Sequence, residues 1–495
     1  MSGVTTRSRS KTKNGNGVAD NNGINGVRNG HGAHRNGHNG CLNGFHQNNT
    51  HGQEELGSSK MVDWLLNKLF FPVCLIICTP NLVVLFWYVN AYCGGSYGEM
   101  VRRLYDGSFV HTLIKIWSGI NIVNRFTVGV VFGYMGYAIL FMRILPGKTI
   151  KGPITPKGNT PIYKDNGFLH YCVMMASFGV LTFVLKMYNM TPTVVYDRFG
   201  ELIAFMNFFA LIFVLMLYFK GKYFPSSTDS GVTGGGFLFD YYWGTELYPR
   251  IFGIDVKVFT NCRFGMTVWP LLVCIYALKS YELHGFVDSM FVSTVLQLAY
   301  ITKFFTWEGG YMHTIDIILD RAGYYICWGC LAWLPALYPL ISYYLVSHPV
   351  HLGYIWTVVV LGLGLLSILV NYLADKQRQD VRSADGKCLV WGSKPRIIRA
   401  KYVTDTGDER ESVLLASGWW GLSRHFHYIP EILLSFFWSV PAGFDNVLPY
   451  TYVIYLIILL VHRSFRDEEK CSKKYGTYWK EYCQEVKYRI VPYVF

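Results

Sequence analysis

A short stretch between Gln297 and Asp320 gathers groups that can hold or transfer a proton. Each ionisable side chain near a membrane span costs about 2.5–3.5 kcal/mol on insertion scales, so each needs a partner, a cavity or a function. Two explanations fit the spacing: a functional site, or an interfacial loop held by a Lys303–Glu308 ion pair. The candidates are Tyr300, Lys303, Glu308, His313, Asp316 and Asp320.

Basic side chains converge in a second stretch, residues 375–396. Arg378 and Arg382 are four residues apart, so on a continuing helix they share one face and could grip a phosphate. An ordinary positively charged cytoplasmic loop explains the same charges equally well. The basic residues of the stretch are Lys376, Arg378, Arg382, Lys387, Lys394 and Arg396.

Two C-terminal stretches, residues 417–431 and 462–492, add aromatic rings to these cations. Arg463 and Asp467 are four residues apart, and Tyr475, Trp479 and Tyr482 follow at helical spacing. Such an aromatic stripe more often serves packing than ligand binding. Together with Arg424, His427 and the basic loop, however, these residues favour a ligand that has anionic phosphates and a flat ring.

The sequence shows no motif that is typical of a soluble nucleotide-binding domain or of a zinc-binding domain. The TGGGF run at 233–237 lacks the spacing of a dinucleotide fingerprint. Cys327 and Cys330 form a lone CxxC inside an apolar run, which does not predict a metal site.

The elements that position these groups are predicted to be transmembrane helices. The 495-residue chain is 51% hydrophobic and only 16% charged, against roughly 25% charged in soluble proteins. Apolar stretches long enough to span a bilayer recur, and we expect an all-α, polytopic protein with about ten spans and a C-terminal cofactor-binding helical module. The predicted spans centre on 69–91, 126–145, 168–188, 200–219, 264–281, 286–305, 324–346, 353–374, 411–440 and 448–462.

The net charge of +13 sits in loops between the apolar stretches, which is typical of a membrane protein and argues against nucleic-acid binding. The basic loops 146–164, 220–263, 375–410 and 463–489 are expected on the cytosolic side, with both termini. Loop 93–125 carries basic residues on the predicted luminal side.

Residues 1–59, rich in Gly, Asn and His, are predicted to be a disordered tail. Residues 60–495 are predicted to be the membrane domain, with its cofactor-binding part at about 375–495.

From about Leu65 to Phe495 the sequence resembles the integral-membrane sterol reductase family, most closely the branch that reduces the delta-7 bond of 5,7-diene sterols such as 7-dehydrocholesterol. The C-terminal segment also resembles the end of isoprenylcysteine methyltransferases, which bind a different cofactor. The segments that carry the resemblance are FDYYWGTELYPR (239–250), TIDIILDRAGYY (314–325), ADGKCLVWGSKP (384–395), SGWWGLSRHFHY (417–428) and HRSFRDEEKCSKKYGTYWKEY (462–482).

The resemblance implies an NADPH-dependent enzyme of sterol biosynthesis in the endoplasmic-reticulum membrane or the nuclear envelope, with a sterol substrate, surrounding membrane lipid and association with other sterol-biosynthesis enzymes. It implies that Tyr300, Glu308 or Asp316 supplies the proton that starts reduction of the alkene. The cofactor positions it implies, with Lys394 and His427 added from the same segments, are Arg378, Arg382, Lys394, Trp420, His427, Tyr428, Arg463, Asp467, Tyr475 and Tyr482.

Several positions depart from the family pattern, and most of them lie in the segments that the resemblance assigns to sterol binding. Lys303 stands where an acid is usual, which reverses a charge in the expected pocket. Two alternatives therefore stay open beside the reductase: a sterol-binding protein that has altered or lost the reaction, and a membrane methyltransferase. The departures are Phe239, Tyr248, Lys303, Cys330, His427 and the Pro430-Glu431 pair.

Overall fold

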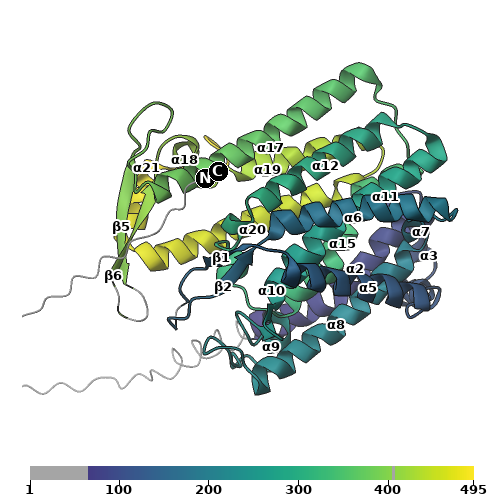
Figure 1. Cartoon of the computed structure of the whole chain (residues 1–495), viewed down its shortest axis with the longest axis horizontal. Coiled ribbons are helices and arrows are strands. Elements are labelled where there is room, and N and C mark those ends of the chain that lie inside the picture. The colour runs from purple at the N-terminus through teal and green to yellow at the C-terminus, as the bar shows by residue number, and fades with distance from the viewer. Residues whose placement is uncertain (1–64, 156, 404–406, 408) are drawn as a thin grey trace, which may run out of the picture. The chain divides into compact units, whose positions relative to one another are not determined.

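The computed structural model describes residues 65–155, 157–403, 407 and 409–495. The tail predicted at 1–59 lies outside these residues. The described chain is mostly helical, as the composition predicts (Figure 1).

Within the described residues, eight helical runs are long and apolar enough to cross a membrane. They are η1 and α2 (Leu65–Phe70, Phe71–Tyr92), α5 (Arg125–Ile144), α6 (Gly167–Met187), α8 (Phe199–Tyr223), α10, η2 and α11 (Val256–Val258, Phe259–Gly265, Met266–His284), η3, α15 and α16 (Tyr324–Trp333, Leu334–Leu337, Leu340–Ser347), α17 (Gly353–Ser383), and η5 and α20 (Leu448–Tyr450, Thr451–Tyr475).

The two other predicted spans have different outcomes. The stretch 286–305 is helical, as α12 (Asp288–Thr306), but is not among the eight. The prediction of one spanning helix over 411–440 is wrong, because this stretch divides into a strand, a four-residue helix and a twelve-residue helix. Gly418 marks the first break: its φ of +64° is readily adopted only by glycine.

Short elements connect the long helices. The helices are α3 (Tyr97–Asp106), α4 (Phe109–Ser118), α7 (Val194–Asp197), α9 (Phe237–Trp243), α13 (Glu308–Tyr311), α14 (Ile315–Ile318), α18 (Trp419–Leu422), α19 (Tyr428–Ser439), η4 (Val440–Ala442) and α21 (Thr477–Glu485). Three antiparallel hairpins pair β1 with β2 (Lys148–Lys151, Ile162–Asp165), β3 with β4 (Arg250–Ile251, Ile254–Asp255) and β5 with β6 (Ile397–Val403, Glu409–Leu415).

The β5–β6 hairpin lies inside the C-terminal part that the sequence predicted to be purely helical. Its register runs from Ile397 opposite Leu415 to Val403 opposite Glu409. Ile398 and Ala400 alternate with exposed residues, and they pack with Trp479 and Tyr482 of α21 in one hydrophobic cluster. The C-terminal module is therefore a small α/β unit at the ends of α17 and α20.

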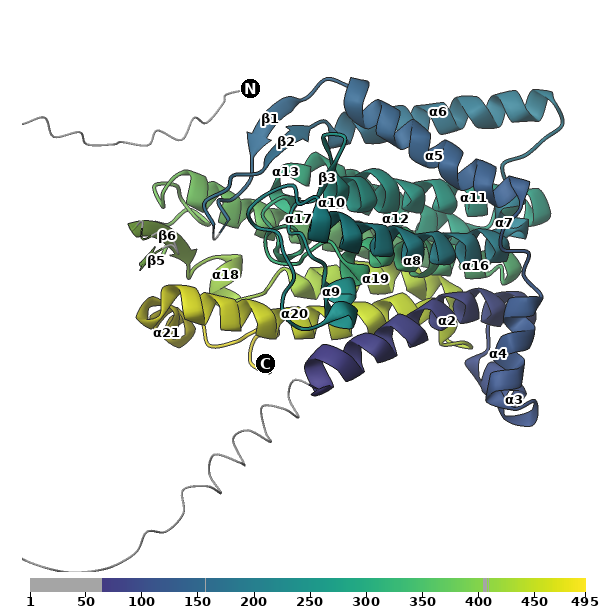
Figure 2. The same cartoon turned by 90° about the horizontal axis from the view of Figure 1, so that it is seen from below.

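The connections gather at two opposite ends of the long helices. The three hairpins and α21 lie toward one end, while α3 and α7 lie at the other (Figures 1 and 2). The hairpins and α21 belong to the four basic loops 146–164, 220–263, 375–410 and 463–489, so these loops have elements at the same end of the helices. This agrees with the prediction, made from their charges, that they share one side of the membrane.

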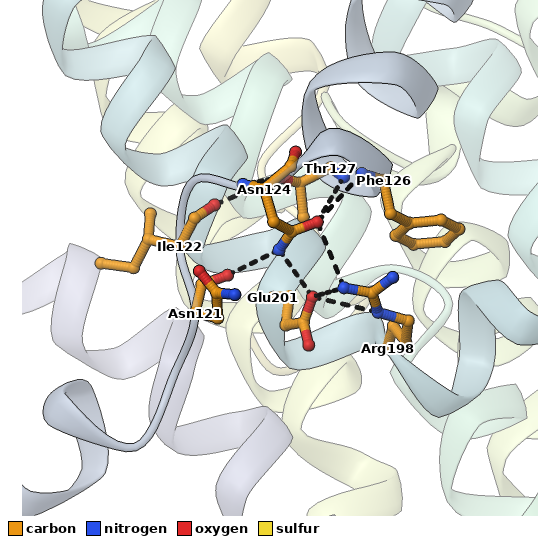
Figure 3. Close-up of polar contacts among 7 residues, drawn as sticks. All are labelled: Asn121, Ile122, Asn124, Phe126, Thr127, Arg198 and Glu201. Atoms are coloured by element: carbon orange, nitrogen blue, oxygen red, sulfur yellow. Dashed lines mark hydrogen bonds and ion pairs between the residues drawn. The ribbon is translucent and has the colours of Figure 1, made fainter.

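At the opposite end, a polar network joins the start of α5 to the start of α8 (Figure 3). Asn124 caps α5 by accepting from the backbone of Phe126 and Thr127, both at 3.0 Å. Its amide donates to Glu201 at 2.8 Å, and Arg198 pairs with the same carboxylate at 2.5 Å. The network fixes the relative position of two spans far from the C-terminal module.

Candidate functional site

Tyr300 of α12 and Glu431 of α19 form the contact that could donate a proton. The Tyr300 hydroxyl donates to Glu431 Oε1 at 2.6 Å. Trp269 and Trp438 hold the phenol ring, with centroids 5.7 and 5.6 Å away. The contact is possible because α19 packs against α12, α17 and α20. A proton is thus shared between a phenol and a carboxyl in an aromatic setting.

Lys303, one turn along α12, connects this pair to α17. Its ammonium donates to Asn371 Oδ1 and lies 3.8 Å from Asp375 Oδ2. The Asn371 amide in turn donates to the His427 carbonyl at 2.9 Å. The Lys303–Glu308 ion pair considered from the sequence is therefore wrong, because the acid beside Lys303 comes from α17.

Glu308 instead forms an ion pair with Arg263 of η2. Both carboxylate oxygens accept from the guanidinium, and the two side chains are 2% and 0% exposed. Arg263 also donates to Asn166 Oδ1 at 3.0 Å. Glu308 thus ties α13 to η2 and to the start of α6.

Asp316 meets one of the predicted cofactor residues. Arg463 of α20 donates to Asp316 Oδ1 at 2.5 Å, and Arg466 makes the equivalent bond to Asp320. Burial raises the pKa of Asp320, and the Arg466 partner opposes that shift. These two pairs connect α20 to the segment around α14.

Arg378, Trp420, His427 and Tyr428 pack together where α17 meets α18, and we call this group the Trp420 platform. The Arg378 guanidinium carbon lies 4.0 Å from the centre of the buried Trp420 ring. The Trp420 indole donates to the Ala374 carbonyl at 2.8 Å, which fixes the ring against α17. His427 stands 4.9 Å from Trp420 and 4.3 Å from Tyr428, centroid to centroid.

His427 keeps one ring nitrogen available. Its Nδ1 is buried and has no hydrogen-bond partner in the described part of the chain. Burial, reinforced by Arg378, lowers the pKa of His427 well below its usual value, so the ring is neutral. A neutral imidazole with a free nitrogen can bind a polar group of a ligand.

The remaining predicted cofactor residues differ in their exposure and in the groups that they contact. Arg382 and Lys394 have exposed side chains, and Arg382 makes only a long 3.4 Å bond to the Val413 carbonyl. Asp467 lies 3.9 Å from His425 Nε2. Tyr475 donates to Ser412 at 3.4 Å, while Tyr482 is buried in the hairpin cluster. Tyr475 and Tyr482 thus support the hairpin.

Sequence reasoning did not assign roles to Glu431, Asn371 and Asp375. An acid after a proline in an apolar stretch was the available signal for Glu431, but its partner is 131 residues away. Arg424, grouped with the phosphate-binding cations, instead donates to the Val486 and Lys487 carbonyls at 2.7 and 2.9 Å. It anchors the C-terminal segment beside His425.

Three departures from the family pattern lie outside these contacts. Phe239 of α9 packs on Trp243. Tyr248 belongs to a small buried cluster with Tyr163 and Val258. Cys330 of η3 accepts from the Asn261 amide at 3.3 Å. Pro430 is buried in the first turn of α19, next to Glu431.

Comparison with known proteins identifies the family. Residues 97–495 match the Ergosterol biosynthesis ERG4/ERG24 family. The chain is 48% identical over 424 residues to "7-dehydrocholesterol reductase" of Arabidopsis thaliana, covering 85% of this chain and 96% of that protein. It is 36% identical over 384 residues to "7-dehydrocholesterol reductase" of Xenopus laevis, covering 77% and 81%. It is 32% identical over 456 residues to "Delta(14)-sterol reductase" of Methylotuvimicrobium alcaliphilum, covering 90% and 100%. These matches confirm the resemblance read from the motifs, and the chain belongs to the ERG4/ERG24 family of sterol reductases.

Proposed function

We propose that this protein reduces a ring double bond of a sterol with NADPH, and that the bond is the delta-7 bond of a 5,7-diene sterol. Two of the relatives above, including the one at 48% identity, are named for 7-dehydrocholesterol. The bacterial relative is named for a different bond, so the choice of bond rests on the higher identity to the first group.

The Tyr300–Glu431 hydrogen bond is the observation that carries the proposal. Reduction of one ring double bond of the diene needs a proton on one carbon and a hydride on the other, and a positioned acid accelerates the proton transfer. The Tyr300 hydroxyl donates to Glu431 at 2.6 Å, so the pair holds a proton that it can deliver to the alkene. When bound, the nicotinamide of NADPH supplies the hydride.

The platform around Trp420 fits the cofactor. Arg378 and the exposed Arg382 provide cations for phosphate, and Trp420 provides a flat apolar face. The free His427 nitrogen can accept a hydrogen bond from a cofactor group. Because Arg463 is already paired with Asp316, we assign it to positioning α14, and we place the phosphate contacts on Arg378 and Arg382.

Tyr300 is the better proton donor of the three predicted residues. Glu308 is held in its buried pair with Arg263, and Asp316 is paired with Arg463, so each carboxylate is already engaged by a guanidinium. Lys303 lies beside Asn371 and Asp375, and its ammonium is 5.9 Å from the centre of the Tyr300 ring. Its positive charge at a usually acidic position favours the second candidate, a sterol-binding protein whose reaction is altered or lost.

We place the protein in the endoplasmic-reticulum membrane, where sterol substrate and lipid are available. The test is the sterol profile of a yeast strain that accumulates 5,7-diene sterols and expresses this chain. We expect the diene to be converted to the delta-5 sterol, and the Tyr300→Phe variant at equal abundance to leave it unconverted. An unchanged profile with abundant wild-type protein would favour the sterol-binding candidate.

A further inference from the structure

A cavity of about 390 Å³ lies between the β1–β2 and β3–β4 hairpins, at the end of α5. Its size falls within the range of ligand pockets, roughly 300–1,000 Å³. None of the residues that line it belongs to the Tyr300–Glu431 pair or to the Trp420 platform. Its hairpins lie at the same end of the helices as the C-terminal module (Figures 1 and 2).

Two unpaired polar groups form the inner wall of this cavity. Asp255 and Tyr163 are only 6% and 5% exposed. Asp255 Oδ1 accepts from the Val258 amide at 3.0 Å, but Oδ2 and the Tyr163 hydroxyl have no partner in the described residues. A buried polar group without a hydrogen bond destabilises the fold, so an acceptor and a donor left together here indicate a bound polar molecule.

Three exposed cations form the rim. Arg143 donates to the Phe252 carbonyl, Lys164 to the Arg143 carbonyl at 2.9 Å, and Arg250 to the Ile162 carbonyl at 2.6 Å. In the described part of the chain none of the three forms an ion pair with an acid. Their carbonyl contacts fix them at the mouth, and the Asp255 carboxylate, which interacts with Arg250, offsets only part of their combined positive charge, which suits an anion.

A second cavity of similar size adjoins the first one and shares Asn166 with it, and its lining is mixed, since it includes the polar Asp165 and Thr306. Pro146, Phe168, Leu169 and Phe305 contribute its apolar lining. A cationic rim, a polar inner wall and the exposed apolar side chains of Phe168 and Leu169 together match an amphiphile better than a small soluble ion.

We propose that the two cavities bind an anionic phospholipid whose headgroup carries hydroxyls. The phosphate lies against Arg143, Lys164 and Arg250, and a headgroup hydroxyl accepts from Tyr163 and donates to Asp255 Oδ2. The acyl chains begin along Phe168 and Phe305. This site is independent of the sterol reaction proposed above, because it shares no residue with it.

The test is native mass spectrometry of the purified full chain with phosphatidylinositol, with phosphatidylcholine, and with soluble inositol 1-phosphate. We expect phosphatidylinositol to bind at least tenfold more tightly than phosphatidylcholine. Lys164→Gln and Arg250→Gln should each weaken that binding about tenfold, since each removes a charge-assisted contact. The matched control Lys151→Gln, on the same hairpin but outside the cavity lining, should leave it unchanged.

Tyr163→Phe and Asp255→Asn test the inner wall without changing side-chain size. Both should abolish the preference for phosphatidylinositol while phosphatidylcholine binding stays the same, and neither should lower the lipid-free thermal stability, because each changes a buried polar group that has no partner there. Equal binding of the two lipids by the wild type, or equal binding by wild type and rim variants, would overturn the proposal. Binding of inositol 1-phosphate as tightly as the lipid would overturn the lipid assignment.

Discussion

The Tyr300 hydroxyl on α12 donates a 2.6 Å hydrogen bond to the Glu431 carboxylate on α19, joining two residues 131 positions apart. Trp269 and Trp438 pack on the same phenol, so its direction is fixed. This contact makes a proton available at one place among the membrane helices.

Tyr300→Phe should lower turnover by roughly 10²- to 10⁴-fold, because it keeps the ring and removes the transferable proton. NADPH affinity should stay the same. Both are measured on purified protein, by steady-state NADPH oxidation and by equilibrium binding. Tyr452→Phe is the control, since Tyr452 packs on the same two tryptophans. If the two variants turned over equally well, the acid would lie elsewhere.

Arg378→Ala should weaken NADPH binding by roughly ten- to a hundred-fold, because a charge-assisted phosphate contact and a stacked guanidinium are lost together. Arg378→Lys should be intermediate, since the charge remains and the planar stacking on Trp420 does not. The control is Lys376→Ala on the exposed part of α17, where Lys376 pairs with Asp380. Cofactor affinity that is unchanged in the Arg378 variants would remove the platform from the binding site.

Glu308→Gln should destabilise the fold by about 3–5 kcal/mol, because it leaves the Arg263 guanidinium buried without its counter-ion. The double variant with Arg263→Gln should lose less than the sum of the single losses. Thermal unfolding in detergent measures both. A Glu308→Gln protein that is fully stable yet inactive would instead identify Glu308 as the proton donor.

Stability should fall as the pH drops below about 6.5, the usual pKa of histidine. Burial lowers the pKa of His425, with Arg378 and Arg424 adding to the shift and Asp467 opposing it. Because the folded pKa lies below the unfolded one, the unfolded chain takes up the proton first, so this contribution to stability is present above pH 6.5 and lost on acidification. His425→Gln should make the decline of the melting temperature with pH shallower, and the exposed His313→Gln should not. Equal slopes in all three proteins would contradict this assignment.

The positions of most spans and of the paired arginines were predictable from local pattern. The length of the apolar stretches is enough to find α5 or α8. The prediction that Arg378 and Arg382 lie on one face of a continuing helix is confirmed, because α17 continues to Ser383. The break at Gly418 and the β5–β6 hairpin were not predicted, since short strands and four-residue helices have weak periodicity.

The partners of the charged groups were the other unpredicted part. Glu308 pairs with Arg263 and not with Lys303, and Lys303 lies beside Asp375 instead, because the packing of α12 against α17 decides which acid it meets. Glu431 was visible in the sequence as an acid in an apolar stretch, but only the packing of α19 on α12 places it at Tyr300. The sequence indicated which residues could take part in chemistry, whereas the contacts between distant segments could be seen only in the structure.

The most direct measurement of the central claim is NADPH oxidation by the purified protein in detergent with 7-dehydrocholesterol, together with mass spectrometry of the sterol. We expect one equivalent of NADPH to be consumed for each diene reduced, and S-adenosylmethionine to have no effect. A protein that binds NADPH and the sterol but never oxidises the cofactor would contradict the reductase account and favour the sterol-binding candidate, with Lys303 as the first residue to exchange for an acid.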